Sequence, residues 1–340
     1  MKRVAWIGAA LLSLALLQPG SKPRLVIIGD STVRNGAGDG RDGQWGWGDQ
    51  IARYFDTTRI TIVNRAIGGR SSRTFITEGR WKSARESLRP GDFVLVQFGH
   101  NDGGAINDTT RARGSLRGAG EDSVVIDNLL TRQRETVRSF GAYLRVYARE
   151  TRERGATPVF LSPVARNRSR EGRGGRVDRS GDSYAGWTRE VALSEGVPFI
   201  DLNELSAAAL DEIIARAGQD VVDSLYFHAD RTHTLLAGAR LNARLVAEAI
   251  RGLEGCALAG YLLDRSRAPD APADDTHFNA YGAHAVARCV IEGFRQNGLT
   301  GILQFERPFP GVFDPARPGD PRDFSLPPSP RVAPTRLPGN

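Results

Sequence analysis

Five short runs of apolar and mostly β-branched residues place the strongest constraint on the fold of this chain. Runs of this kind are typical of strands that are buried on both faces of a parallel sheet. Helix-like patterns lie between them, among them residues 47–54, 136–154 and 206–217. Because strands and helices alternate, the sequence predicts an α/β fold: a three-layer α/β/α domain with a doubly wound, five-stranded parallel sheet. The expected strands are residues 24–30, 60–66, 92–99, 157–164 and 197–202.

The two ends of the chain depart from this alternation. A basic pair precedes the apolar residues 4–17, which are too few to span a bilayer comfortably, and a turn-like exit follows. This pattern predicts a secretory signal peptide over residues 1–21 and a periplasmic or extracellular location. No clear cleavage signal follows, so an uncleaved anchor is the alternative. Residues 306–340 are Pro-rich, which predicts an extended strap or a disordered tail. The folded domain is therefore expected over residues 22–263.

Composition and charge narrow the class of protein. The 340 residues are 40% hydrophobic and 25% charged, which excludes a collagen-like, coiled-coil or wholly disordered chain. The net charge of +7 suits an acidic polymer, either nucleic acid or a uronic-acid polysaccharide, but the basic residues are scattered rather than clustered. The two cysteines, Cys256 and Cys289, could form one disulfide in an exported protein or remain buried thiols. They are too few for a structural zinc site.

Residues suited to nucleophilic catalysis follow three of the predicted strands. Ser31 follows the first strand in Gly-Asp-Ser-Thr, Gly69 the second, and Asn101 the third in Gly-His-Asn-Asp. At the carboxyl edge of a parallel sheet, where a strand opens into a helix, a Ser hydroxyl is accessible and backbone N–H groups can bind developing negative charge. An Asn side chain there can donate to an oxyanion. The structural alternatives are a helix cap for Ser31, a tight turn for Gly69 and a loop cap for Asn101.

An Asp-x-x-His pattern occurs in both copies of an internal repeat, residues 230–251 and 274–295, in which ten of 22 aligned positions are identical. In each copy the Asp can accept a hydrogen bond from one imidazole nitrogen and leave the other free as a base. The first copy is favoured because it follows the fifth strand after one helix. The second has the better helix N-cap, Asn279. The two candidate pairs are Asp230 with His233 and Asp274 with His277.

This ordered set of motifs resembles the GDSL or SGNH hydrolase superfamily, which has a flavodoxin-like fold. Longer stretches are similar to rhamnogalacturonan acetylesterases, the carbohydrate esterases that remove acetyl groups from pectin. The resemblance extends over about residues 24–263. The stretches that carry it are GDSTVRNG, GWGDQIARYF, NRAIGGRSSRTFITEGRW, VQFGHNDGGAINDTTRARGSL, GATPVFLSPVARN, GVPFIDL and DRTHTLLAGARLNARLVAEAI.

The resemblance implies a role for each candidate residue. Ser31 would be the nucleophile, and His233 would be the general base and then the general acid. Asp230 would orient that histidine. The oxyanion hole would consist of the Ser31 and Gly69 backbone N–H groups and the Asn101 side chain.

The second copy of the repeat is a departure from the family pattern. Two Asp–His pairs cannot serve one Ser, so residues 264–305 are expected to pack on the domain as a spare copy of the unit. The alternative is that Asp274 and His277 are the catalytic pair and the first copy is the spare one.

The resulting prediction is an exported, monomeric serine esterase that removes O-acetyl groups from an acidic pectic polysaccharide through an acyl-Ser31 intermediate. No cofactor, metal or nucleic acid is expected, and no membrane after signal cleavage; a metal set of His228, Asp230 and His233 lacks a fourth ligand. The alternatives are a general GDSL esterase or lipase on small acyl esters and a non-catalytic carbohydrate-binding protein. The arginines expected to suit galacturonate carboxylates are Arg65, Arg70, Arg111 and Arg113.

Overall fold

The central feature of the computed structural model is one parallel sheet with the strand order β2-β1-β3-β6-β7. Each of these strands lies within one of the five predicted runs, so the prediction of a five-stranded parallel sheet is confirmed. The strands are β1 (Arg24–Gly29), β2 (Thr61–Asn64), β3 (Phe93–Gln97), β6 (Thr157–Leu161) and β7 (Phe199–Ile200). The structure describes residues 22–35, 40, 42–168, 177, 179, 183–265, 290–291, 294–295 and 298.

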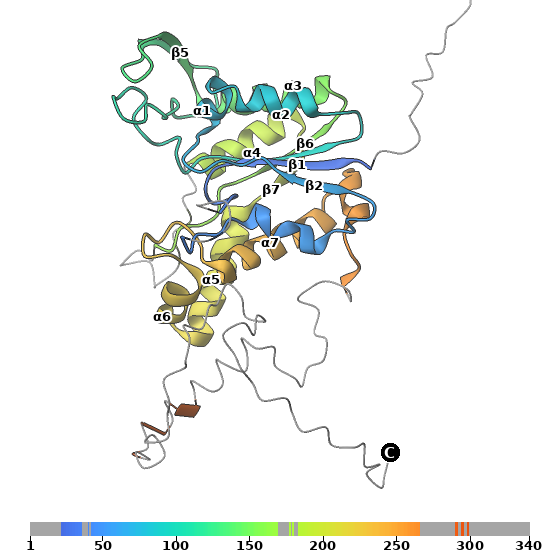
Figure 1. The fold of residues 1–340 in the computed structure, drawn as a ribbon, viewed down its shortest axis with the longest axis vertical. Helices are drawn as coiled ribbons and strands as arrows, with labels where there is room; N and C mark the ends of the chain where they lie inside the picture. The colour runs from blue at the N-terminus through green and yellow to red at the C-terminus, as the bar shows by residue number, and fades with distance from the viewer. Residues whose placement is uncertain are drawn as a thin grey trace, which may run out of the picture.

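Helices cover both faces of the sheet and complete the predicted three layers (Figure 1). One layer contains α1 (Ser72–Thr77), α2 (Arg80–Ser87), α3 (Phe140–Glu153) and α4 (Tyr184–Glu195). The other contains η1 (Trp47–Asp49), η2 (Ile51–Tyr54), α5 (Leu202–Ala217) and α7 (Leu236–Arg251). Shorter segments flank α7, namely α6 (Gln219–Val221), η3 (Val222–Tyr226) and η4 (Ala257–Tyr261).

Side chains along β1 alternate between two hydrophobic cores, one under each helical layer. Leu25 and Ile27 pack in the core that α7 covers, whereas Val26 and Ile28 pack in the core that α1 to α4 cover. All four are at most 1% exposed. A strand with both faces buried in this way reads as a continuous apolar run, which is why the sequence revealed it.

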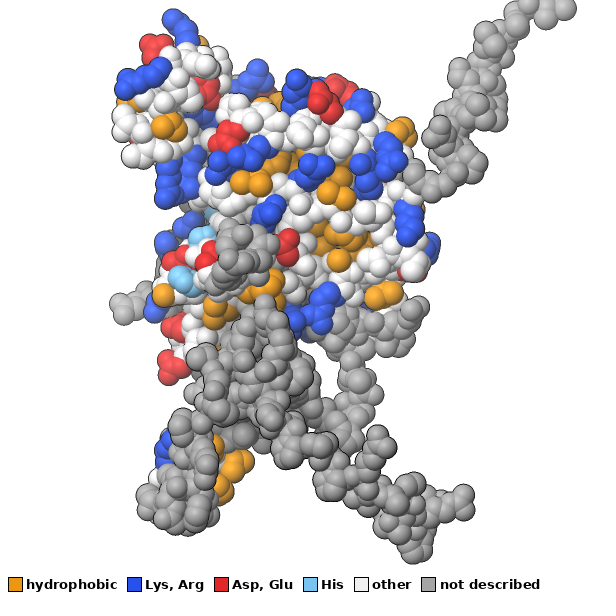
Figure 2. Space-filling view, in the orientation of Figure 1, with side chains coloured by type: hydrophobic (Ala, Val, Ile, Leu, Met, Phe, Trp, Pro, Cys, Tyr) orange, Lys and Arg blue, Asp and Glu red, His pale blue; other side chains and the backbone are white. Residues whose placement is uncertain are grey.

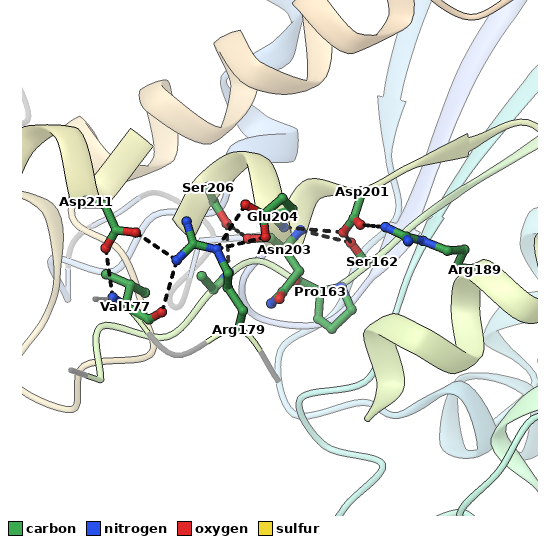
Figure 3. Close-up of polar contacts among 11 residues, drawn as sticks. Ser162, Pro163, Val177, Arg179, Arg189, Asp201, Asn203, Glu204, Ser206 and Asp211 are labelled. Carbon is green, nitrogen blue, oxygen red and sulfur yellow. Dashed lines mark hydrogen bonds and ion pairs between the residues drawn. The ribbon is translucent and has the colours of Figure 1, made fainter. Parts of the chain in front are cut away.

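Polar contacts fasten the start of α5 to the segment that follows β6 (Figure 3). The Ser162 hydroxyl donates to Asp201, the N-cap of α5, and accepts from the Asn203 N–H. Arg179 forms ion pairs with Glu204 and Asp211 at 2.8 and 2.7 Å. Because Asp201 caps the helix, α5 begins four residues before the predicted start at residue 206.

A hairpin of β4 (Ser123–Asp127) and β5 (Arg134–Arg138) projects from the upper layer and was not predicted (Figure 1). The prediction of a helix over residues 136–154 was wrong at its start, because residues 136–138 belong to β5. Helix α3 begins only after Ser139, whose side chain caps it by accepting from the Ala142 N–H. The predicted helix over residues 47–54 consists instead of the two short 3-10 turns η1 and η2.

Several predictions fall on parts of the chain outside the described residues. These are the signal peptide, the tail over 306–340, and most of the second repeat copy with Asp274 and His277. Cys256 is buried beside α7, whereas Cys289 also lies outside the described residues. Of the helices that the structure describes, none has the length and apolar character to cross a membrane.

Candidate active site

Ser31 lies at the carboxyl edge of the sheet, directly after β1. Strand β1 pairs with β2 on one side and β3 on the other, so the edge beside it is the point where the strand order reverses. Ligands of doubly wound folds bind in the crevice at such a point. The expected helix start is instead a turn, in which the Val33 and Arg34 N–H groups donate to the Asp30 carbonyl. A turn leaves the Ser31 side chain partly exposed, as a nucleophile requires.

The first repeat copy places its histidine against this serine. The Nε2 atom of His233 lies 2.7 Å from the Ser31 Oγ, and its Nδ1 atom lies 2.5 Å from an Asp230 carboxylate oxygen. The other carboxylate oxygen of Asp230 accepts the N–H groups of Thr232 and His233. Burial raises the pKa of Asp230, but these hydrogen bonds and that from the His233 ring outweigh it and leave the pKa below its ordinary value. Asp230 therefore remains ionised beside the imidazole.

The loop that carries His233 is held by its neighbours rather than by the Asp–His pair alone. Thr234 is buried and forms bridge pairs with Trp45 and Phe227. Its hydroxyl donates to the Trp45 carbonyl at 2.6 Å, and the Trp45 N–H donates back to the Thr234 carbonyl. The loop after β1 and the loop before α7 are thus joined one residue away from His233.

The predicted oxyanion donors surround Ser31 from two further strand ends. Within the described residues, the N–H groups of Ser31 and Gly69 have no acceptor. The Asn101 side-chain nitrogen donates one of its two hydrogens to the Arg70 carbonyl at 2.9 Å. The second hydrogen remains available to an oxyanion. Gly68 lies against the serine, because a Cβ placed on it would be 3.7 Å from the Ser31 Cβ. Three donors are therefore available where an acyl oxygen could be held.

Arg70 holds the peptide between Gly68 and Gly69, a role that sequence reasoning missed. Its Nη1 atom donates to the Gly68 carbonyl at 3.0 Å, and its Nε atom pairs with Glu78 at 2.9 Å. Because a trans peptide is planar, a Gly68 carbonyl that points toward Arg70 directs the Gly69 N–H to the opposite side. Gly69 has a φ of +76°, a conformation that glycine adopts without strain. The only sequence signal is the adjacency of the arginine to the two glycines.

Two titratable residues with shifted pKa values, His100 and Asp102, flank Asn101 in the sequence and were also missed. Asp102 is fully buried and accepts hydrogen bonds from the Ser72 N–H and hydroxyl and the Ser115 hydroxyl. Burial raises the pKa of Asp102 to about 6 despite these bonds. Burial lowers the pKa of His100 to about 4, which Asp30 opposes and Arg166 reinforces.

A buried polar chain supports the turn that carries Ser31. Asp30 accepts from the Thr32 N–H and hydroxyl at 2.9 and 2.8 Å. The Gln97 amide donates to the Thr32 hydroxyl, and the Trp47 ring N–H donates to Gln97, both at 2.8 Å. This chain links the end of β1 to β3 and η1, and so fixes the backbone on both sides of Ser31.

Comparisons with known proteins identify the family to which this chain belongs. Residues 27–241 match the GDSL-like Lipase/Acylhydrolase family. The chain is 31% identical over 241 residues to a rhamnogalacturonan acetylesterase of Emericella nidulans, covering 71% of this chain and 90% of that protein. It is 32% identical to a probable rhamnogalacturonan acetylesterase of Bacillus subtilis, covering 67% and 93%.

A solved structure agrees with the fold. The crystal structure of the protein YxiM from Bacillus subtilis aligns with a TM-score of 0.55 at 25% identity, covering 70% of this chain and 59% of that one. The sheet order, the site at its reversal point and the family match together define the class. This chain belongs to the GDSL-like lipase and acylhydrolase family, and the predicted SGNH hydrolase fold is confirmed.

Proposed function

We propose that this protein is a serine esterase in which Ser31 attacks the acyl carbon of an ester. The observation that carries the proposal is the continuous chain from Asp230 through His233 to Ser31, with contacts of 2.5 and 2.7 Å. A serine hydroxyl becomes a useful nucleophile only when a base takes its proton, and this base is oriented by an ionised carboxylate.

The two halves of the reaction use the same groups in opposite directions. His233 takes the Ser31 proton as the Oγ–C bond forms, and the oxyanion accepts the N–H groups of Ser31 and Gly69 and the Asn101 side chain. The imidazolium then returns the proton to the leaving alcohol, which leaves an acyl-Ser31. Water enters, gives a proton to His233 and attacks the acyl carbon, and the carboxylic acid leaves with Ser31 restored.

The substrate that we propose is an O-acetylated acidic polysaccharide of the pectic type. Two matched relatives bear the name rhamnogalacturonan acetylesterase, and they cover two thirds or more of this chain. The net charge of +7 favours association with a polyanion. We also propose that residues 1–21 direct export, which would bring the enzyme to an extracellular or periplasmic polymer.

The experiment is hydrolysis of 4-nitrophenyl acetate by the wild type and by Ser31→Ala, His233→Ala and His277→Ala. We expect loss of about 10³-fold or more in kcat for the first two variants and little change for the third. Loss of activity in His277→Ala alone would show that the general base is His277, in the second repeat copy. An inactive wild type would favour a binding protein.

The substrate class needs its own measurement. Acetate release from acetylated pectin fragments is compared with release from neutral acetylated xylan by the same preparation. Preference for the pectin fragments is expected, and the reverse preference would contradict the pectic assignment without affecting the esterase chemistry.

A further inference from the structure

An open cleft of about 400 Å³ lies beside the proposed oxyanion hole. This volume is within the range of roughly 300–1,000 Å³ that is common for ligand sites. Gly68 and Gly69 form the wall that the cleft shares with the active site, and Gly68 is the residue that lies against Ser31. The other lining residues are Arg70, Thr74, Glu78, Thr110, Arg111, Arg113 and Leu130. A group bound here would therefore belong to the same sugar chain as the acyl group at Ser31.

The cleft carries an excess of positive charge, with three arginines against one glutamate. Arg70 is occupied by Glu78 and by the Gly68 carbonyl. In the part of the chain that the structure describes, Arg113 makes one side-chain hydrogen bond, to the Gly69 carbonyl at 3.2 Å, and has no ion pair. The exposed Arg111 side chain has no polar partner among the same residues. Two guanidinium groups thus line the cleft without an ion-pair partner among the described residues.

The electrostatic environment of Arg113 favours an added anion. Burial lowers the pKa of this half-buried guanidinium, and the positive charge of Arg111 lowers it further; the charges of Asp30, Asp102 and Asp108 oppose these effects without cancelling them. A guanidinium stays protonated in proteins, so this repulsion is relieved by a bound anion rather than by proton loss. Lys and Arg side chains gather on the surface below the hairpin, on the edge where histidine side chains are visible (Figure 2).

The loop that carries these two arginines is rigidly built. One Asp108 oxygen accepts the N–H groups of Thr110, Arg111 and Ala112. These hydrogen bonds hold the pKa of Asp108 well below its usual range, so the turn persists across ordinary pH.

A buried arginine fixes the same loop from inside. Arg73 is 1% exposed and donates to the carbonyls of Ile106 and Gly114 at 2.7 and 2.8 Å. It also forms a two-bond ion pair with Glu135 of the hairpin. Because the loop is already held in place, binding a ligand costs less conformational entropy than it would in a flexible loop.

We propose that Arg111 and Arg113 form a subsite for a uronate carboxylate of the sugar chain that carries the acetyl group. The inference rests on the proposed function for the identity of that sugar chain. The planar fork of a guanidinium matches a carboxylate with two parallel hydrogen bonds, which a neutral sugar cannot replace. Leu130 at the hairpin tip is 45% exposed and lines the same cleft, so it offers an apolar surface to the C–H face of a sugar ring.

Binding of an unacetylated rhamnogalacturonan tetrasaccharide to the full chain tests the subsite by calorimetry. We expect Arg111→Gln and Arg113→Gln each to weaken binding about tenfold, the change that one charge-assisted hydrogen bond supplies. Methyl-esterifying the tetrasaccharide should weaken its binding to the wild type and abolish the difference between wild type and variants. Arg53→Gln is the matched control, because it removes the same charge from an exposed residue of η2 in the opposite helical layer.

The outcomes separate this inference from the esterase proposal. The subsite would be overturned by any of four results. These are equal binding of the free acid and the methyl ester, unchanged binding in Arg111→Gln, an equal loss in Arg53→Gln, and no binding at all. 4-Nitrophenyl acetate hydrolysis by the same preparation reports on the esterase. An active enzyme without acid preference refutes only the subsite, whereas an inactive protein with arginine-dependent acid binding refutes only the esterase.

Discussion

The hydrogen bond from Arg70 to the Gly68 carbonyl determines which way the Gly69 N–H points, and Arg70→Met tests this. The variant keeps a long side chain but loses the contact with Gly68 at 3.0 Å and the pair with Glu78. Glu78 keeps its second partner, Arg80, at 2.7 Å, so no unpaired charge is created. Two successive glycines resist reorientation of their shared peptide less than other residues would. Without the guanidinium the peptide can turn its carbonyl toward the oxyanion position.

The size of the effect follows from the bond that is lost. A hydrogen bond from a charged donor contributes about 1.5–3 kcal/mol, and a loss of about 2 kcal/mol changes the ratio of the two peptide orientations about 30-fold. Loss of one oxyanion donor costs about 10²–10³ in rate, which sets the upper limit. We expect kcat for 4-nitrophenyl acetate to fall roughly 10- to 100-fold. KM should change little, because the donor acts on charge that develops in the transition state.

Arg80→Met is the matched control for Arg70→Met. Both arginines pair with Glu78, and their side chains are 32% and 35% exposed, but Arg80 has no contact with the glycines among the described residues. Steady-state kinetics of the two variants are compared with wild type. An equal fall in kcat for both variants, or a change confined to KM, would refute the role of Arg70 in orienting the peptide.

Three other predictions concern the support of the site. Asp230→Asn should lower kcat for 4-nitrophenyl acetate by about 10²–10⁴, and unchanged kinetics would exclude the Asp230–His233 contact from catalysis. Arg73→Met should lower the free energy of unfolding by about 3–5 kcal/mol, because Glu135 loses its ion pair and two carbonyls lose their buried donor. A melting temperature within a degree of wild type would contradict this. Because burial raises the pKa of Asp102 to about 6, the native state binds this proton more tightly than the unfolded chain, so its contribution to stability is lost as pH rises from about 4 to 6. His100 has the opposite sign, since its lowered pKa of about 4 makes stability fall as pH drops below 6.5. Denaturant titrations across this range should show a steeper rise of stability with pH in Asp102→Asn than in wild type, and parallel curves would refute the assignment.

The sheet was predictable because burial left a direct mark on the sequence. Strands β1 and β3 have side chains in both cores, which produced uninterrupted apolar runs. The hairpin left no such mark, because only Val137 in β4 and β5 is buried and the other side chains are largely exposed. Without burial on one face, a strand lacks the apolar alternation by which sequence reveals it.

The parts of the site that were predictable are those in which side-chain chemistry and local spacing coincide. Asp-x-x-His contains its own hydrogen bond, and the strand-end motifs lie where an α/β fold places ligands. The role of Arg70 was not predictable, because it depends on the direction of one peptide plane and on the partner Glu78 eight residues away. Asp102 and His100 depend on burial that spacing cannot measure.

The choice between the two repeat copies depends on a residue outside the Asp–His spacing. In the first copy Thr234 follows the histidine, and its buried hydroxyl donates to the Trp45 carbonyl at 2.6 Å. The corresponding residue of the second copy is Phe278, which has no hydroxyl to donate. If the second copy lay at this edge, the hydrogen bond to the Trp45 carbonyl would be lost. The larger phenylalanine side chain would also have to fit into the space of Thr234, which is only 2% exposed. This asymmetry supports Asp230 and His233 as the catalytic pair for a reason that neither motif spacing nor helix capping provides.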